Sequence, residues 1–377
     1  MSTTEHGAMG QQQSPGLLVL MSRFLRLDIP LTLGLLMLCG LSLVVLYSAT
    51  SQDLGAVQRQ MVRFGLAFGV MLVVAHVPPT VLQRSSVFFY GVGLAMLVVV
   101  LLVGDVGKGA QRWLDLGFMR FQPSELMKVA VPMMVAWFVS QQPLPPTFGR
   151  LVVALGIVGI PAALIMRQPD LGTALLVAGA GLAVVFMAGM QWRYILGAIA
   201  LAATAAPVLW ANMHAYQQQR VLTFLNPEAD PLGSGYHIIQ SKIAVGSGGL
   251  FGKGWLNGTQ SHLDFLPERH TDFIFAVFGE EFGLIGALAL MGLYLFVILR
   301  GLWLAADSQG AYGRLVSGAM VVTFLVYLFV NVGMVIGLLP VVGVPLPLVS
   351  YGGTSLVTLM IGFGIIMSAH SHRRLLS

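Results

Sequence analysis

The apolar stretch EFGLIGALALMGLYLFVILR, residues 281–300, decides the fold of this chain. Its residues Phe282–Leu299 carry no charge, and a helix of about twenty such residues is long enough to cross the hydrocarbon core of a bilayer. Similar apolar runs recur along the 377 residues, of which 56% are hydrophobic and only 9% are charged. The sequence therefore predicts a polytopic integral membrane protein.

The apolar runs are continuous rather than alternating, which excludes a transmembrane β-barrel and predicts an all-α membrane fold. We expect about ten transmembrane helices, with one large extracytoplasmic loop, residues 213–280, between spans seven and eight. Residues 1–28 are expected to form a cytoplasmic tail with an interfacial segment, and 29–377 a single membrane domain. The expected helices cover about residues 30–49, 60–78, 86–103, 124–140, 150–166, 172–190, 193–212, 281–300, 314–339 and 354–371.

Charge distinguishes the two sides of the predicted bundle. With ten spans both termini share one side, and placing them in the cytoplasm puts nine arginines in or beside the inner loops against five basic residues in the short outer loops. Twelve of the fifteen acidic residues then lie on or near the outer side. The arginines are scattered singly and form no stripe that would bind nucleic acid. The single cysteine, Cys39, excludes an intramolecular disulfide and a Cys-rich metal site.

Polar residues follow the third and fifth predicted spans. Glu125 and Lys128 are three residues apart, so they share one helix face, and they form either a structural ion pair at the membrane edge or a wall of a substrate cavity. Arg112 beside Trp113 is suited to hold an anion next to a sugar or lipid, although a lone tryptophan at this depth is more typical of an interfacial anchor. Asp170 either caps the sixth helix or belongs to the same polar site.

The long loop contributes the basic residues Arg220 and Lys242 and a glycine-rich run, 246–254. This run is not a nucleotide-binding loop, because Gly254 follows Lys253 where such a loop requires Ser or Thr. Two interpretations remain open. The run is either a flexible loop or a place where backbone N–H groups approach an anion.

The densest group of charges ends the long loop. Glu268, Arg269, His270 and Asp272 lie within five residues, where apolar sequence resumes. Capping of the next helix by Thr271 or Asp272 is one interpretation. The other is general-base chemistry, because a carboxylate beside a His or Arg, near lipid but open to water, is suited to accept a proton.

Two further expectations concern neighbouring segments. Glu280 and Glu281 are expected to line the same cavity if residues 272–280 form a partly buried segment. The uncharged run 339–355, with three prolines, is expected to form a rigid turn between the last two spans. Ser350 in this run is either part of that structural turn or a hydrogen-bond donor into the cavity. It has no His base nearby in sequence, which argues against a hydrolase nucleophile.

Five motifs, in this order across about residues 27–375, resemble the SEDS family (shape, elongation, division and sporulation), and its elongation branch rather than its division branch. The motifs are GAQRWLDLG (109–117), QPSE (122–125), QPDLGT (168–173), LPERHTDFIFA (266–276) and PLVSYGG (347–353). The resemblance implies a peptidoglycan glycosyltransferase of the bacterial cytoplasmic membrane, acting on lipid II beside a class B penicillin-binding protein. It matches Asp272 to the essential acid of the family, and Glu125, Lys128 and Asp170 to its polar cavity.

The residues fit that chemistry. Asp272 is the candidate catalytic base, and the cations are of the right types to bind a leaving pyrophosphate. No nucleotide is required, and Mg²⁺ or Mn²⁺ is the one cofactor left open, without a dedicated metal site. A flippase for lipid II is the rival hypothesis, although no internal repeat supports it. The candidate substrate-binding residues are Arg112, Trp113, Glu125, Lys128, Asp170, Arg220, Lys242, Glu268, Arg269, His270 and Ser350.

Overall fold

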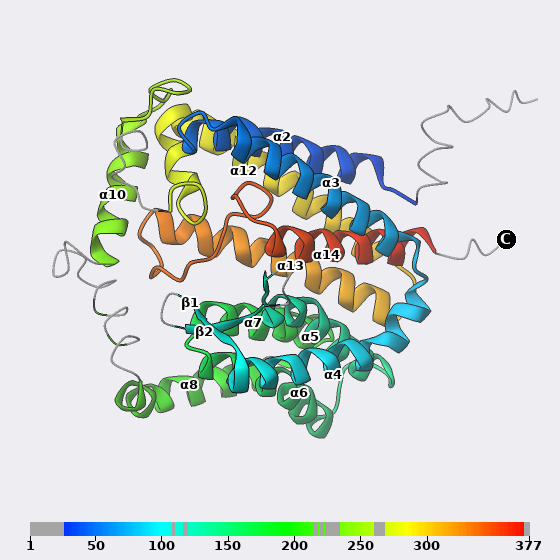
Figure 1. Ribbon diagram of the computed structural model, residues 1–377. Coiled ribbons are helices and arrows are strands. Elements are labelled where there is room, and N and C mark those ends of the chain that lie inside the picture. The colour runs from blue at the N-terminus through cyan, green and yellow to red at the C-terminus, as the bar shows by residue number, and fades with distance from the viewer. Residues whose placement is uncertain are drawn as a thin grey trace, which may run out of the picture.

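A computed structural model describes residues 26–107, 110–115, 120–213, 218, 222, 234–259 and 268–372. Its long helices form a bundle in which successive helices run in opposite directions between two ends (Figure 1). The elements are α2 (Ile29–Ala49), α3 (Leu54–His76), α4 (Pro79–Val103), β1 (Asp105–Gly107), β2 (Ala110–Asp115), β3 (Arg120–Phe121), α5 (Pro123–Ser140), α6 (Phe148–Arg167), α7 (Leu171–Met187), α8 (Trp192–Asn212), α10 (Ser234–Ser247), α12 (Ile274–Asp307), α13 (Gly310–Val335) and α14 (Thr354–Ser371).

The all-α membrane fold predicted from the sequence is confirmed. A helix lies at each of the ten predicted places, and among the described residues seven helices are long and apolar enough to cross a membrane. The exceptions are α5, α7 and α8, so the count of ten spans stays a prediction. The three antiparallel strands β1–β3 and the helix α10 were not predicted, because each is short and lies in a segment without a clear apolar period.

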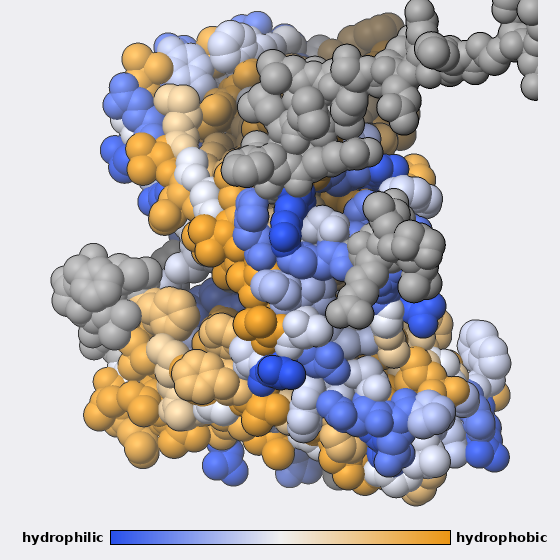
Figure 2. All heavy atoms as spheres, turned by 90° about the vertical axis from the view of Figure 1, so that its right-hand side faces the viewer, coloured by the Kyte–Doolittle hydropathy of each residue, from blue (hydrophilic) through white to orange (hydrophobic). Residues whose placement is uncertain are grey.

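The two ends of the bundle differ. One end, the α10 end, carries β1–β3, α10, the turn 268–273 and the loop 336–353. At the other, the far end, α2 begins and both α12 and α14 finish, so both described ends of the chain lie there (Figure 1). Figure 2 faces the far end, where hydrophilic residues gather over the middle of the surface. Residues 26 and 372, at which the described chain begins and ends, therefore lie at the same end of the bundle, and the cytoplasmic location of both termini stays a prediction.

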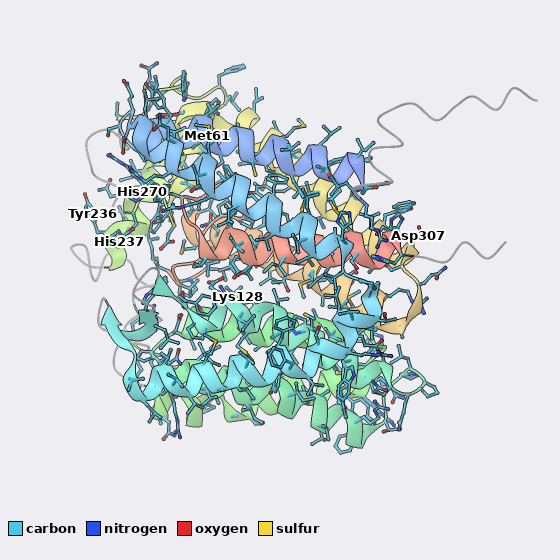
Figure 3. The ribbon with its side chains drawn as sticks, turned by 45° about the vertical axis from the view of Figure 1, so that its right-hand side comes forward. Met61, Lys128, Tyr236, His237, His270 and Asp307 are labelled. Carbon is cyan, nitrogen blue, oxygen red and sulfur yellow. The ribbon has the colours of Figure 1, made fainter. Side chains whose placement is uncertain are left out.

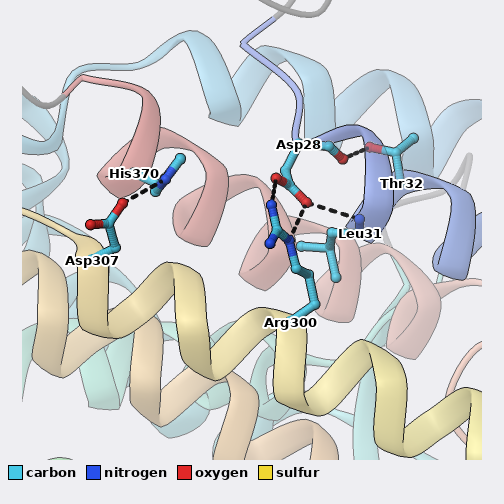
Figure 4. A network of polar contacts seen from close by, with 6 residues as sticks. All are labelled: Asp28, Leu31, Thr32, Arg300, Asp307 and His370. Carbon is cyan, nitrogen blue, oxygen red and sulfur yellow. Dashed lines mark hydrogen bonds and ion pairs between the residues drawn. The ribbon is translucent and has the colours of Figure 1, made fainter.

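The far end is closed by ion pairs between helices (Figure 4). Arg300 of α12 donates from Nε and Nη2 to the two carboxylate oxygens of Asp28, at 3.0 and 2.6 Å. Asp28 also caps α2 by accepting from the backbone N–H of Leu31. Asp307 at the end of α12 lies 3.0 Å from Nε2 of His370 in α14. These contacts fasten α12 to α2 and α14.

Helix α12 is broken at Gly283, whose φ of 65° and ψ of −163° are accessible essentially to glycine alone. The glycine-rich run packs against this break. A Cβ on Gly248 or Gly252 would collide with the carbonyl oxygen of Gly279 or Glu281. The backbone N–H groups of Lys253 and Gly254 donate to Glu280 and Glu281 at 3.0 Å, and that of Leu284 donates to Gly249 at 2.9 Å. The glycine-rich run therefore packs against α12 as a structural element. Neither a flexible loop nor a backbone that binds an anion describes these contacts.

Candidate active site

The turn before α12 presents Asp272, and a buried asparagine fixes its backbone. Nδ2 of Asn331, from the interior of α13, donates to the carbonyl oxygen of Asp272 at 2.8 Å and to that of Val344 at 2.7 Å. Asn331 is fully buried. The turn and the loop 336–353 are thereby tied to the same side chain, and Asp272 has a fixed backbone position without using its own carboxylate.

Ser350 fixes the same turn from the other side. Its hydroxyl donates to the carbonyl oxygen of Thr271 at 2.5 Å and accepts from the backbone N–H of Leu346 at 2.8 Å. The backbone N–H of Tyr351 donates to the carbonyl oxygen of His270 at 2.9 Å. Both partners of the Ser350 hydroxyl are backbone groups. Its contacts therefore match a role within the structural turn rather than that of a donor into the cavity, and they hold the turn next to Asp272.

Glu125 and Lys128 form the ion pair expected from their spacing. Nζ of Lys128 lies 2.6 Å from Oε1 of Glu125 and 5.1 Å from the centroid of the Tyr327 ring, and both charged side chains are almost completely buried. Oε2 of Glu125 is buried and has no hydrogen-bond partner among the described residues. A buried oxygen without a partner is costly, so this pair retains hydrogen-bonding capacity.

An apolar cavity of ≈ 320 Å³ adjoins Glu125. It is bounded by α3, α4, α5 and α14, and its lining includes Val74, Phe89, Met133 and Ile361. Phe89 and Val81 in the same lining are exposed on the outside of the bundle. In a membrane the cavity is therefore suited to a hydrocarbon chain whose polar group lies near Glu125.

Asp170 both caps a helix and pairs with a cation. Its Oδ1 accepts from the backbone N–H of Thr173 at 3.2 Å, while its Oδ2 lies 3.3 Å from Nε2 of Gln122 and 3.6 Å from Nε of Arg112. Nη2 of Arg112 also donates to the carbonyl oxygen of Pro169 at 2.5 Å. Both alternatives for Asp170 therefore apply together. Trp113 follows Arg112 on β2 and is half-buried.

The loop 336–353 connects these groups to Asp272. A Cβ on Gly172, two residues after Asp170, would lie 2.8 Å from the carbonyl oxygen of Val342. A Cβ on Gly343 would lie 3.4 Å from Oδ2 of Asp272. Adjacent loop residues thus contact the start of α7 and the Asp272 carboxylate, which brings two acids from distant parts of the chain to one site.

The other predicted site residues lie around this centre. Oγ1 of Thr271 donates to Glu268, Nη2 of Arg269 donates to Oγ of Ser51 at 2.9 Å, and the His270 ring lies edge-on to Tyr351. Figure 3 shows His270 at the α10 end and Lys128 deeper in the bundle.

Two of the remaining predicted site residues, Lys242 and Arg220, lie in the long loop. Lys242 is exposed on α10, with its Cδ 3.1 Å from the position of a Cβ on Gly337. Arg220 lies outside the described residues. In the described part of the chain, no group of three or more His, Cys, Asp or Glu is arranged to hold a metal ion.

Glu280 and Glu281 have a different role from the one expected. Residues 274–281 are indeed buried, but Oε1 of Glu280 accepts from Nζ of Lys253 at 2.7 Å and from Thr259, and Glu281 accepts from the Ser48 hydroxyl. These acids anchor the glycine-rich run and α2. The expectation that they line the Asp272 cavity is not supported, because the direction of their side chains depends on packing against segments that are distant in the sequence.

The sequence interpretation missed several residues next to Asp272. Asn331 carried a signal, because a polar residue inside an apolar span is a functional candidate. His237 of α10 carried none: its ring stacks on Phe273 at 5.8 Å, and burial lowers its pKa although the charge of Glu268 opposes this. Figure 3 shows His237 beside Tyr236 at the α10 end.

Comparisons with known proteins give a consistent result. The family model FtsW/RodA/SpoVE, described as "cell cycle protein", matches residues 21–375. Peptidoglycan glycosyltransferase MrdB of Escherichia coli strain K12 is 53% identical over 352 residues, covering 93% of this chain and 95% of that protein. Peptidoglycan glycosyltransferase RodA of Treponema pallidum is 31% identical, covering 92% and 98%.

Solved structures are similar over almost the whole chain. A chain from "Structural coordination of polymerization and crosslinking by a peptidoglycan synthase complex" matches with a TM-score of 0.81 and 30% identity, covering 92% of this chain and 99% of that chain. The rod shape determining protein RodA of Thermus thermophilus matches with a TM-score of 0.69 and 28% identity, covering 92% and 98%.

Proposed function

Because this chain belongs to the FtsW/RodA/SpoVE family of cell cycle proteins, we propose that it polymerises lipid II during cell elongation, with Asp272 as the general base. The chain is a peptidoglycan glycosyltransferase, the activity named for relatives that it matches over nearly their whole length. Lipid II carries a disaccharide-peptide on undecaprenyl pyrophosphate. Its apolar tail and charged diphosphate suit a site where the buried Lys128 pairs with Glu125 beside an apolar cavity.

The assignment of Asp272 as the general base rests on the fixed backbone of the turn that carries it. Hydrogen bonds from Asn331, Ser350 and Tyr351 hold the backbone of residues 270–272, so the carboxylate is presented from a rigid support. Such support favours catalysis because the base needs no reorganisation as the reaction proceeds. In the reaction, an acceptor sugar hydroxyl transfers its proton to Asp272 as its oxygen bonds the anomeric carbon of the donor. The bond from that carbon to the diphosphate breaks, and the diphosphate leaves with the electron pair.

Lys128 and Arg112 are the cations best suited to the leaving diphosphate. Lys128 is buried and Arg112 is partly buried, and each pairs with an acid, Glu125 or Asp170. A diphosphate that approaches competes with these acids for the two cations. Each contact between a cation and a phosphate oxygen is stronger in a site that excludes water than it is in water. The ≈ 320 Å³ cavity beside Glu125 would take the first part of the polyprenyl tail.

The remaining assignments follow from this chemistry. The α10 end would face the outside of the cytoplasmic membrane, where lipid II presents its sugar, and both termini would lie in the cytoplasm. Residues 29–377 would act as one membrane domain. A class B penicillin-binding protein is the proposed partner, because a similar chain occurs in a complex described as coordinating polymerization and crosslinking.

The test uses purified protein in liposomes with lipid II, with and without the penicillin-binding partner. We expect glycan polymer from the wild type and a rate about 10²–10⁴-fold lower from Asp272→Asn, whereas Asp307→Asn at the far end retains polymerisation. Polymerisation by a folded Asp272→Asn protein at close to the wild-type rate would exclude Asp272 as the base. Transbilayer movement of lipid II without any polymer would favour the flippase instead.

A further inference from the structure

A second cluster of cations lies at the α10 end and has no part in the mechanism above. Arg59 and Arg63 stand four residues apart on α3, hence on one helix face, and both reach Tyr351 in the loop before α14. Nε of Arg59 donates to the Tyr351 hydroxyl at 3.3 Å, and the guanidinium carbon of Arg63 lies 4.3 Å from the centroid of the Tyr351 ring. One tyrosine therefore holds two guanidinium groups close together.

Hydrogen-bond donors outnumber acceptors in this cluster. Gln60 is fully buried, and its Oε1 accepts from Nη1 of Arg63 and from the backbone N–H of Gly352, both at 3.4 Å. Its Nε2 is buried without a partner among the described residues. Arg59 has an exposed partner, Asp53, at 3.2 Å, whereas no carboxylate in the described part of the chain pairs with Arg63. The missing acceptors and the excess positive charge suit an oxyanion.

This cluster adjoins the turn that presents Asp272. Tyr351 donates its backbone N–H to His270, and the two rings lie edge-on with centroids 5.8 Å apart. Lys128 and Arg112 approach from α5 and β2 instead, and each already has an acid partner. The cluster beside the turn therefore keeps one cation, Arg63, without a carboxylate partner in the described part of the chain.

We propose that Arg59 and Arg63, positioned by Tyr351 and Gln60, bind the diphosphate of a second lipid-linked substrate. This inference rests on the proposed function, because an enzyme that joins two lipid-linked glycans must hold two diphosphates at once. Lys128 and Arg112 serve one of them and the arginine pair serves the other. The phosphate oxygens supply the acceptors that the guanidinium groups lack.

Binding of inorganic pyrophosphate tests this site apart from polymerisation. Wild type, Arg63→Gln and Arg63→Lys are titrated with inorganic pyrophosphate in phosphatidylcholine vesicles, and the same compound is tested as an inhibitor of polymerisation. The control is Arg193→Gln, which removes an arginine that lies 4.8 Å from the Tyr194 ring centroid at the start of α8. We expect Arg63→Gln to weaken binding and inhibition about tenfold or more, Arg63→Lys to restore part of the loss, and Arg193→Gln to have no effect.

Equal pyrophosphate affinity of folded wild type and Arg63→Gln would overturn the proposal, even if both proteins polymerise. Loss of binding in vesicles that contain phosphatidylglycerol would overturn it too, because the site would then hold a phospholipid headgroup. If the wild type binds pyrophosphate through Arg63 but makes no polymer, the proposed function fails while the anion site stands.

Discussion

Two ion pairs, one at each end of the bundle, use their charges differently. At the far end both carboxylate oxygens of Asp28 have partners: Oδ1 accepts from Leu31 and Arg300, and Oδ2 accepts from Arg300 (Figure 4). The guanidinium carbon of Arg300 also lies 4.2 Å from the Trp303 ring centroid. Near the α10 end, Glu125 uses Oε1 for Lys128 and leaves Oε2 without a partner in the described structure.

The difference separates a structural pair from a pair that is suited to function. A carboxylate such as that of Asp28, with a donor on each oxygen, fastens two helices and leaves neither oxygen without a partner. The desolvation cost of a buried ion pair can exceed its attraction, so a buried pair with an unused oxygen beside a cavity is better suited to function than to stability. The predictions below test this distinction in order of expected effect.

The largest effect is expected at Asp272. Asp272→Asn should lower the polymerisation rate by about 10²–10⁴-fold, because general-base catalysis contributes on this order. The thermal unfolding midpoint should stay close to that of the wild type, because Asn331 binds the backbone oxygen of Asp272 and not its carboxylate. Rate measurements with lipid II, beside thermal unfolding of the same samples, would check both parts.

The next effect concerns the buried pair. Lys128→Met alone should reduce activity about 100-fold and stability by about 3–5 kcal/mol, because it leaves a buried carboxylate without its partner. The double variant Glu125→Leu/Lys128→Met should recover most of the stability and none of the activity. Recovery of activity in the double variant would show that the pair is structural after all, like Asp28–Arg300.

An intermediate effect is expected at Asn331. Asn331→Leu removes both hydrogen bonds to the carbonyl oxygens of Asp272 and Val344, which should lower kcat about 10–100-fold through misplacement of the base. KM for lipid II should change little, because Asn331 contacts the turn and not the substrate. An effect confined to KM would contradict this positioning role.

The far-end pair should affect stability alone. Asp28→Asn weakens the contacts of Asp28 with Arg300 and Leu31, so unfolding should cost about 1–2 kcal/mol less, with kcat unchanged. Denaturation of the reconstituted protein measures the first quantity and the polymerisation assay the second. A large fall in kcat would mean that the far end is coupled to the site.

The smallest effect is expected in the pH dependence of folding stability, through His237. Burial lowers its folded pKa, so between that value and about 6.5 the unfolded chain binds more protons than the folded one, and stability rises with pH. The contribution of neutral His237 to the stability of the fold is complete above about pH 6.5 and is lost as the pH falls toward the folded pKa. His237→Gln should therefore narrow the difference in unfolding midpoint between about pH 7.5 and 5.5.

The sequence by itself determined the membrane class, the places of the long helices and the main candidates for the site. Apolar runs and helical spacing are local properties, so the run 281–300 and the pair Glu125–Lys128 could be identified from neighbouring residues alone. The motif around Asp272 was recognisable for the same reason.

Only the tertiary structure decided how these parts meet. The packing of Gly252 on the break at Gly283, and the bonds from Asn331 to Asp272 and from Gly352 to Gln60, join residues that are distant in the chain. No local pattern records such pairs, because their energies depend on which backbone groups the fold brings within hydrogen-bonding distance.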